Sequence, residues 1–269
     1  MLTMIDIREE LRTKYKNPLR PTIPQRDLSE IKGMVIHCTD DPDSGNASDV
    51  YATAKYHTSS PNHISPRGAP SICYHYYVER DKENNLVCYQ CLNDTDIGWH
   101  AGDTVYKTHQ WNNMFLGIVV DHKAADQIPE DKEKALVEIA AKKCLQYGLA
   151  PDRGVIFHRD VVGSGCYYTD SQGRVAVIGK KVYRKDCPGW SLTWELFVAD
   201  VRAEAWRMVQ EDGLGKFFKD GTNAETFFSS DIREQIKTFQ RLNGLPLSGL
   251  LDDNTTSRIN DKFNLKIKF

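Results

Sequence analysis

The position of two histidines after two short apolar runs constrains the fold of this chain more than any other feature. His37 follows the run 34–36, and His158 follows the run 155–157. Short runs of this kind, rich in β-branched residues, are typical of buried strands. In open α/β sheets, ligand sites lie at the carboxyl ends of the strands. We therefore predict that both imidazoles belong to a site at such an edge.

A third donor lies further along the chain. Cys187 precedes a rigid Pro-Gly turn, and Lys185 stands two residues before it. Two imidazoles and a thiolate are the protein ligands of an open zinc site, which keeps a fourth position for water. The separations are too long for a local metal signature, so ordinary core histidines and a buried thiol are an open alternative. Asp186 and Cys166 are rival metal donors in the same region.

Composition excludes several classes of partner. The formal net charge is −2, so the chain has no broad attraction for nucleic acid or acidic lipid. No apolar run is long enough for a transmembrane span, and the charged start lacks a secretory signal. Seven cysteines, an odd number, favour free thiols in a reducing compartment. We expect a monomer that uses neither nucleic acid nor a membrane. The spacing of Cys88 and Cys91 is interpreted as coincidence, because no second pair follows.

The fold class follows from alternating patterns between residues 30 and 210. Strands are expected at 34–36, 74–79, 86–91, 116–120 and 155–157, and amphipathic helices at 131–148 and 191–210. This alternation predicts an α/β fold, with a central mixed sheet flanked by helices. The first 24 residues suggest a short helix with Ile7, Leu11 and Tyr15 at a spacing of four.

Six short segments occur in an order that carries a family resemblance. They are Gly33-Met-Val-Ile-His37-Cys-Thr, Tyr74-His75-Tyr-Tyr-Val-Glu-Arg-Asp, Gly98-Trp-His100-Ala-Gly, Leu116-Gly-Ile-Val-Val, Phe157-His158-Arg-Asp and Lys185-Asp-Cys187-Pro-Gly. Over residues 30–205 the chain resembles the zinc-dependent N-acetylmuramoyl-L-alanine amidases of the type 2 class. That class includes phage lysis amidases and peptidoglycan recognition proteins. The resemblance implies a Zn²⁺ cofactor, and bacterial peptidoglycan as the substrate.

The resemblance also implies a role for individual residues. The zinc ligands would be His37, His158 and Cys187. Tyr74 would hydrogen-bond near the metal-bound water, and Lys185 would stabilise charge on the carbonyl oxygen under attack. His57 and His100 resemble histidines of the substrate groove, although either is equally explained as a hydrogen-bonded structural residue. Each of the others has its plain alternative: Tyr74 as a packing aromatic and Lys185 as a solvated loop charge. Asp121 is a weaker candidate for orienting a ligand from behind.

The same reasoning divides the chain into four parts. These are an N-terminal arm at 1–24, a zinc amidase domain at 25–210, a linker at 211–225 and a small all-α module at 226–269. Ile232, Ile236, Phe239 and Leu242 are expected to line one face of a helix in that module. The module resembles helical peptidoglycan-binding modules of wall hydrolases. The segment 163–183 is longer than the usual family loop and suggests a β-hairpin.

These features favour a phage endolysin that accumulates in the host cytoplasm without a signal peptide and acts on the wall after release. Two alternatives stay open. One is a non-catalytic peptidoglycan recognition protein, which would bind muropeptides in the same groove. The other is a bacterial cytosolic amidase that recycles soluble muropeptides.

Overall fold

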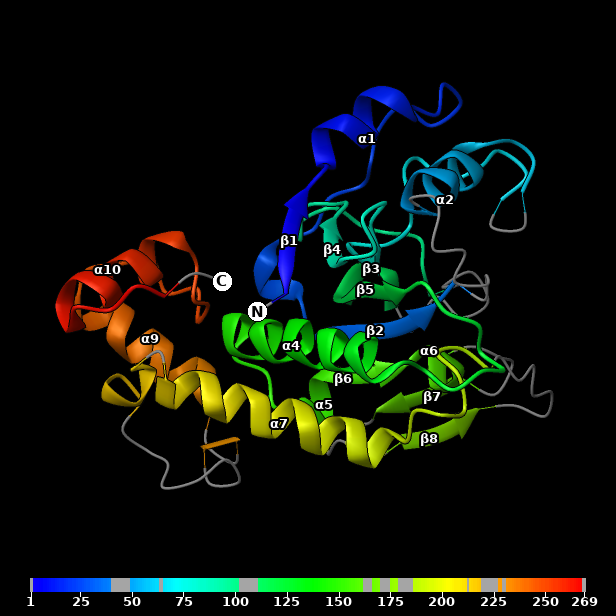
Figure 1. The fold of residues 1–269 in the computed structure, drawn as a ribbon. Coiled ribbons are helices and arrows are strands. Elements are labelled where there is room, and N and C mark those ends of the chain that lie inside the picture. Colours follow the sequence, from blue (N-terminus) through cyan, green and yellow to red (C-terminus); the bar gives the residue numbers. More distant parts are fainter. Residues whose placement is uncertain are drawn as a thin grey trace. The chain divides into compact units, whose positions relative to one another are not determined.

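A six-stranded mixed sheet forms the centre of the fold, in the strand order β1-β4-β3-β5-β2-β6 (Figure 1). The computed structural model describes residues 2–39, 49–62, 65–101, 111–161, 166–169, 175–178, 186–211, 213–218, 227–228 and 231–267. The strands of the main sheet are β1 (Thr3–Asp6), β2 (Gly33–Cys38), β3 (Tyr76–Arg80), β4 (Leu86–Gln90), β5 (Phe115–Val120) and β6 (Val155–Phe157). The predicted α/β class is confirmed.

The helices are α1 (Arg8–Lys14), α2 (Asp49–Thr58), α3 (Trp111–Met114), α4 (Glu130–Tyr147), α5 (Pro151–Gly154), α6 (His158–Val161), α7 (Trp194–Glu211), α9 (Ile232–Leu242) and α10 (Asp253–Phe263), with short 3₁₀ turns η1 (Leu28–Glu30) and η2 (Leu214–Lys216). The two long helices predicted at 131–148 and 191–210 begin and end within three residues of the predicted positions, whereas α2, α3, α5 and α6 were not predicted. Within the described part of the chain, none of these helices is both long and apolar enough to cross a bilayer.

The chain divides into two compact units. The first contains residues 1–136 and 156–192, and the second contains residues 137–155 and 193–269. Helix α4 therefore begins in the first unit and ends in the second. The second unit gathers the end of α4, α5 and α7 with the C-terminal helices, whereas we expected α7 to belong with the amidase domain. The assignment of residues 211–225 to a linker stays a prediction, since part of that segment lies outside the described residues.

Strand pairing positions the carboxyl end of β2. Strands β2 and β5 are parallel, with His37 opposite Val119 and Val35 opposite Gly117. Strand β5 is also parallel to β3, which is antiparallel to β4. Because directly paired residues point to the same side of a sheet, His37 shares its face with Val119 and Gly117. Helices α1 and α2 cover this face and bury Leu11, Val50 and Ala54 against it (Figure 1).

The N-terminal arm contains a strand that the sequence did not indicate. Thr3–Asp6 pairs in parallel with the edge strand β4, and helix α1 starts only at Arg8. The prediction of a helix without a preceding strand was therefore incomplete. Its helical part holds, since Ile7 and Leu11 are buried. The physical reason for the strand is non-local: the open edge of β4 offers backbone hydrogen bonds that no local pattern reveals.

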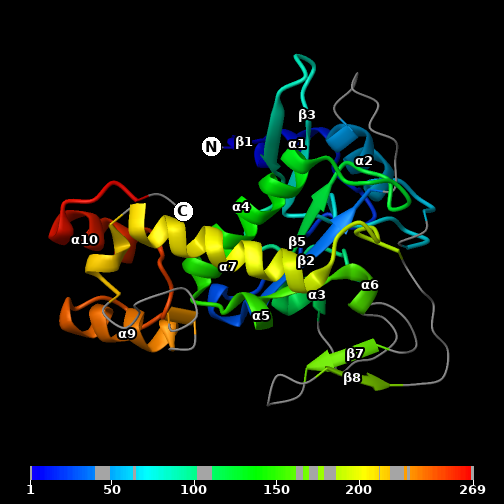
Figure 2. The ribbon, with the colours of Figure 1, turned by 60° about the horizontal axis from the view of Figure 1, so that its bottom comes forward.

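The long segment before Cys187 contains the expected hairpin. Strands β7 (Cys166–Thr169) and β8 (Val175–Ile178) pair antiparallel, and Figure 2 shows them as a separate two-stranded ladder. Strand β7 contacts α6, the short helix that begins at His158. The turn between the strands lies outside the described residues. The insertion is thus anchored next to one of the candidate ligands.

The second unit is held together by aromatic rings. Neighbouring centroids lie 4.5 to 6.4 Å apart in a cluster formed by Trp206, Phe217, Phe218, Phe227, Phe228, Phe239 and Phe263. Arg233 on α9 donates from Nε to the carbonyl of Tyr147 at the end of α4, at 2.8 Å. A cation near the last carbonyls of a helix is favourable. The C-terminal helices therefore pack directly on α7 and α4 within this unit.

Candidate metal centre

Three potential metal donors from distant parts of the chain converge. His37 lies in β2, His158 is the first residue of α6, and Cys187 lies in the turn that follows the hairpin segment. Their ligand atoms all lie within 4.8 Å of one another. Both histidines are buried, and Cys187 is half-buried. The structure thus brings together the three residues that the sequence proposed as ligands.

The backbone at the end of β2 donates a hydrogen bond to the sulfur of Cys187. The N–H of Cys38 donates to Cys187 Sγ at 3.1 Å, and His37 Nδ1 lies 3.9 Å from the same sulfur. A backbone donor that points at a thiolate stabilises its charge, and the thiolate is the form of cysteine that binds metals. The end of β2 therefore supplies both one ligand and a hydrogen bond to another.

Arg159 fastens the cysteine turn to α6. Its backbone N–H donates to the carbonyl of Cys187 at 2.7 Å. Its guanidinium donates to the carbonyls of Gly189 at 2.6 Å and Leu192 at 2.8 Å. The same group lies 4.9 Å from the ring centroid of Trp190. Because Arg159 follows His158 directly, these bonds hold two ligand segments against each other.

A second histidine holds the ring of His37. His100 Nδ1 lies 3.0 Å from His37 Nε2, and His100 Nε2 lies 3.1 Å from the carbonyl oxygen of Phe115. His100 is 6% exposed, and burial lowers its pKa to about 3, which keeps the ring neutral. We had predicted that His100 binds substrate. In this arrangement both of its ring nitrogens have hydrogen-bonding partners within the protein, as the structural alternative expected, and the substrate-binding role stays a prediction.

The close approach of His100 to the sheet depends on Gly117. A Cβ at that position of β5 would lie 2.8 Å from His100 Cγ, which is too close. Glycine at a strand position of this kind often marks such a close approach. Within the motif Leu-Gly-Ile-Val-Val, the absence of a side chain at Gly117 therefore makes room for the ring of His100.

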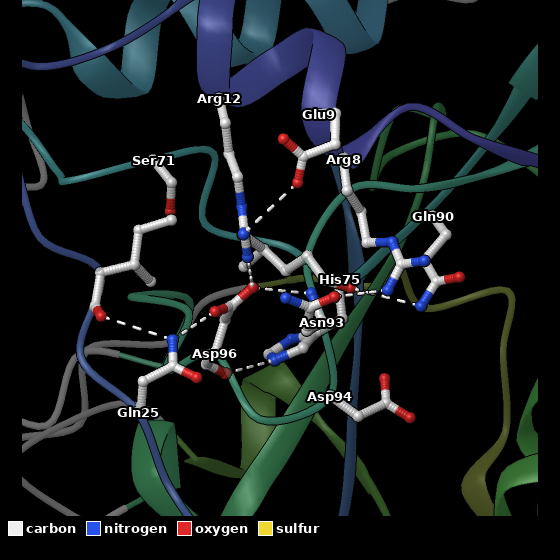
Figure 3. A network of polar contacts seen from close by, with 12 residues as sticks. Arg8, Glu9, Arg12, Gln25, Ser71, His75, Gln90, Asn93, Asp94 and Asp96 are labelled. Atoms are coloured by element: carbon white, nitrogen blue, oxygen red, sulfur yellow. Dashed lines mark hydrogen bonds and ion pairs between the residues drawn. The ribbon is translucent and has the colours of Figure 1, made fainter. Parts of the chain in front are cut away.

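Behind this pair lies a buried polar network. His75 Nδ1 accepts from the N–H of Gly117 at 3.0 Å, and burial with the nearby charge of Arg26 lowers the pKa of His75 well below its usual value. His75 Nε2 lies 2.9 Å from the carbonyl oxygen of Asp96, as Figure 3 shows. The Asp96 carboxylate in turn binds Arg12 of α1 and Gln25. The network thus links the N-terminal arm to the histidine layer.

Two residues line the candidate ligands on the side of α2. The ring centroid of Tyr74 lies 5.2 Å from that of His37 and 5.5 Å from that of His57. His57 is buried, and its Nδ1 accepts from the N–H of Cys73 at 3.1 Å. Nε2 therefore carries the proton in the neutral ring. Both residues lie near the predicted ligands, while their catalytic and substrate-binding roles stay predictions.

The remaining candidates have different positions. Lys185 lies outside the described residues, as does the side chain of Cys166. The carboxylate of Asp186 accepts from Trp190 Nε1 at 2.8 Å, and Asp186 is not part of the donor cluster. Asp121 is buried. Its Oδ1 accepts from Thr39 at 3.2 Å, and its backbone carbonyl accepts from the buried Lys132 at 2.5 Å.

Sequence reasoning missed three residues that shape this site. Arg159 was noted only as part of a motif, although its position next to a predicted ligand was a usable signal. Gly117 was also part of a motif, and the signal there was a glycine inside a strand pattern. Arg26 had no signal: its buried guanidinium donates to the carbonyls of Asp94 and Phe115 at 2.8 and 3.0 Å, and contacts between residues so distant in sequence follow only from the fold.

The donor set fits a particular class of metal. Imidazole nitrogen and thiolate sulfur are the ligands that Zn²⁺ prefers, whereas Mg²⁺ and Ca²⁺ prefer oxygen. Three protein donors match the ligand count of a zinc site with an open position. Among the described residues this is the one group of histidine, cysteine or acidic side chains with suitable spacing for a metal.

A comparison with solved structures found several that match this chain. Solved structures of similar fold include the N-acetylmuramoyl-L-alanine amidase LysC from Clostridium intestinale, at 16% identity and a TM-score of 0.46, covering 75% of this chain and 98% of that chain. Another is the Drosophila peptidoglycan recognition protein SD, at 16% identity and a TM-score of 0.47, covering 73% and 93%. A mutant endolysin from Bacillus subtilis matches at 19% identity and a TM-score of 0.46, covering 75% and 99%.

The sequence itself matches a family model. A comparison with curated proteins found no significant relative. The family model described as N-acetylmuramoyl-L-alanine amidase matches residues 27–190, which is more than half of the chain and includes all three candidate ligands. The chain therefore belongs to the N-acetylmuramoyl-L-alanine amidase family.

Proposed function

We propose that this protein is a zinc-dependent amidase that hydrolyses the bond between N-acetylmuramic acid and L-alanine in bacterial peptidoglycan. The observation that carries the proposal is the convergence of His37, His158 and Cys187 within 4.8 Å, inside the segment that matches the family model. Zinc held by such a set supplies an activated water at neutral pH and polarises a carbonyl group.

The protein's own side chains would serve the rest of the reaction. Water adds to the lactyl carbonyl carbon, the carbon–nitrogen bond breaks, and a proton passes to the nitrogen of the departing L-alanine. Tyr74 would move this proton, a role that the 5.2 Å between the ring centroids of Tyr74 and His37 supports. The ammonium of Lys185 would stabilise the negative oxygen, an interaction typically worth about 3–4 kcal/mol.

The test is hydrolysis of purified peptidoglycan, measured as new L-alanine amino termini. The wild type should release them and should lose this activity when a chelator removes the metal. Cys187→Ser should be inactive and bind zinc weakly. Cys144→Ala is a matched control, because Cys144 is a buried thiol of α4 in the second unit and should leave zinc and activity unchanged. A wild type that binds zinc but releases no L-alanine would instead identify a recognition protein.

We further propose that the cellular role is wall lysis of the endolysin type, with the C-terminal helices as a wall-binding element. A binding element on an insoluble polymer raises the local enzyme concentration without a new catalytic contact. The test is co-sedimentation with insoluble walls. It uses the full chain with Cys187→Ser, because an inactive variant separates binding from hydrolysis. Protein that stays in the supernatant would contradict this role.

A further inference from the structure

The candidate ligand His37 has two ring nitrogens, and only one orientation of its proton suits a metal. Nδ1 faces the donor cluster, 3.9 Å from Cys187 Sγ, whereas Nε2 faces His100. A nitrogen that carries a proton has no lone pair to give to a metal. Metal binding at this site therefore requires the tautomer with the proton on Nε2.

The contacts of His100 determine which tautomer is favoured. Its Nε2 lies 3.1 Å from the carbonyl oxygen of Phe115, and a carbonyl oxygen only accepts hydrogen bonds, so His100 Nε2 donates. The neutral ring then presents an unprotonated Nδ1, which lies 3.0 Å from His37 Nε2. That nitrogen accepts from His37, which leaves the lone pair of His37 on Nδ1.

The carbonyl group of Phe115, which accepts the hydrogen bond from His100, is itself held in place. Arg26 Nη1 donates to it at 3.0 Å, and the guanidinium is anchored by the carbonyl of Asp94 at 2.8 Å. Gly117 leaves room for the His100 ring, since a Cβ there would lie 2.8 Å from its Cγ. The ring planes of His37 and His100 are close to perpendicular, at 87°, with centroids 5.1 Å apart. These contacts restrain both rings.

We propose that His100 is a positioning residue that accepts the Nε2 proton of His37 and so holds His37 Nδ1 ready for the metal. This assigns it a role behind the ligand and not in the substrate groove. The zinc part of the proposal rests on the proposed function, whereas the tautomer part concerns the metal-free chain. Partners of metal-bound histidines typically change metal affinity by about 10- to 100-fold when removed.

The first test is the tautomer of His37 in the metal-free wild type, read from the nitrogen shifts of ¹⁵N-labelled histidine. An unprotonated Nδ1 and a protonated Nε2 are expected. The opposite tautomer would overturn the proposal. This readout needs neither zinc nor activity, so it stands even if the wild type proves to bind no zinc and the proposed function fails.

The second test compares two variants by competition for zinc with a chromogenic chelator. His100→Leu removes the acceptor and should weaken zinc binding by about 10- to 100-fold. His100→Asn places an amide oxygen close to the position of Nδ1 and should restore most of the affinity. Wild-type affinity in His100→Leu, or an equal loss in a folded His100→Asn, would show that the residue only packs.

Discussion

The two units of the molecule differ in the kind of side chain that they bury. The first unit buries imidazole, guanidinium, ammonium and carboxylate groups beside its sheet, among them His37, His75, His100, Arg26 and Lys132. In the second unit, the described residues bury Lys143, Gln240 and Thr255 as their polar members, and aromatic rings make up much of the interior.

This difference has an energetic meaning. Burying a polar group is costly unless it is hydrogen-bonded, and burying a charge costs more. The first unit bears these costs around the candidate metal centre, where His75, His100 and Arg26 have the hydrogen-bonding partners described above. The second unit avoids most of them. The concentration of polar burial beside the donor cluster therefore identifies the first unit as the one that holds the candidate metal centre.

Removal of a candidate metal ligand from the first unit should have the largest effect, a loss of hydrolysis. His158→Ala deletes one of the three donors, and the loss of several kcal/mol of charge stabilisation predicts at least about a 1,000-fold fall in hydrolysis. Zinc content and release of L-alanine amino termini are measured on the same preparation. Unfolding of the second unit should be unchanged. Full activity in the variant would remove His158 from the ligand set.

The second-largest effect, a loss of stability, is expected when one partner of the buried charge pair in the first unit is removed. Lys132 is fully buried, with its Nζ 3.9 Å from Asp121 Oδ2. Lys132→Met leaves the carboxylate without this cation, which typically costs about 3–5 kcal/mol. The free energy of unfolding by urea is the measurement. The double variant Lys132→Met/Asp121→Asn is the control and should recover part of the loss. Equal losses in both would mean that the pair itself is not the cause.

A smaller loss of stability is expected when the buried amide group in the second unit is removed. Gln240 Nε2 donates to Ser248 and Thr255 at 2.8 and 2.9 Å, and its Oε1 accepts from the N–H of Gly249. Gln240→Leu removes these hydrogen bonds, takes the acceptor away from the N–H of Gly249 and should cost about 1–3 kcal/mol. Zinc affinity should not change, in contrast to the variants of the first unit. Gln210→Leu on the exposed surface of α7 is the control; a matching loss there would point to a nonspecific effect.

Five of the six strands of the main sheet and the long helices α4 and α7 were predicted well because their patterns are local. It also indicated all three members of the donor cluster, although their roles as zinc ligands stay predictions. Leu242 shows where local pattern fails: it was expected on the same face as Ile232, Ile236 and Phe239, yet it is 78% exposed as the last residue of α9. At a helix end the periodicity no longer guarantees a neighbour to pack against.

Contacts between distant segments could not be predicted in this way. Strand β1 depends on a free sheet edge, and the bond between His37 and His100 joins residues 63 positions apart. The motif around His100 suggested the substrate groove, a role that stays a prediction, because a motif does not say on which side of a ligand a side chain lies. The fold alone supplies that information.

The buried imidazole of His75 should make the stability of the first unit depend on pH. Burial lowers the pKa of His75 well below 6.5 in the folded chain, while the unfolded chain keeps the ordinary value. Below about pH 6.5 the unfolded state thus binds one more proton, and stability falls as the pH falls, by up to about 1.4 kcal/mol per pH unit. Above that pH the contribution is complete. His75→Asn keeps an acceptor for Gly117 but does not titrate, so its stability should depend less steeply on pH. Urea unfolding of both metal-free proteins between pH 7.5 and 5 measures the two slopes, and identical slopes would show that His75 is not a source of acid sensitivity.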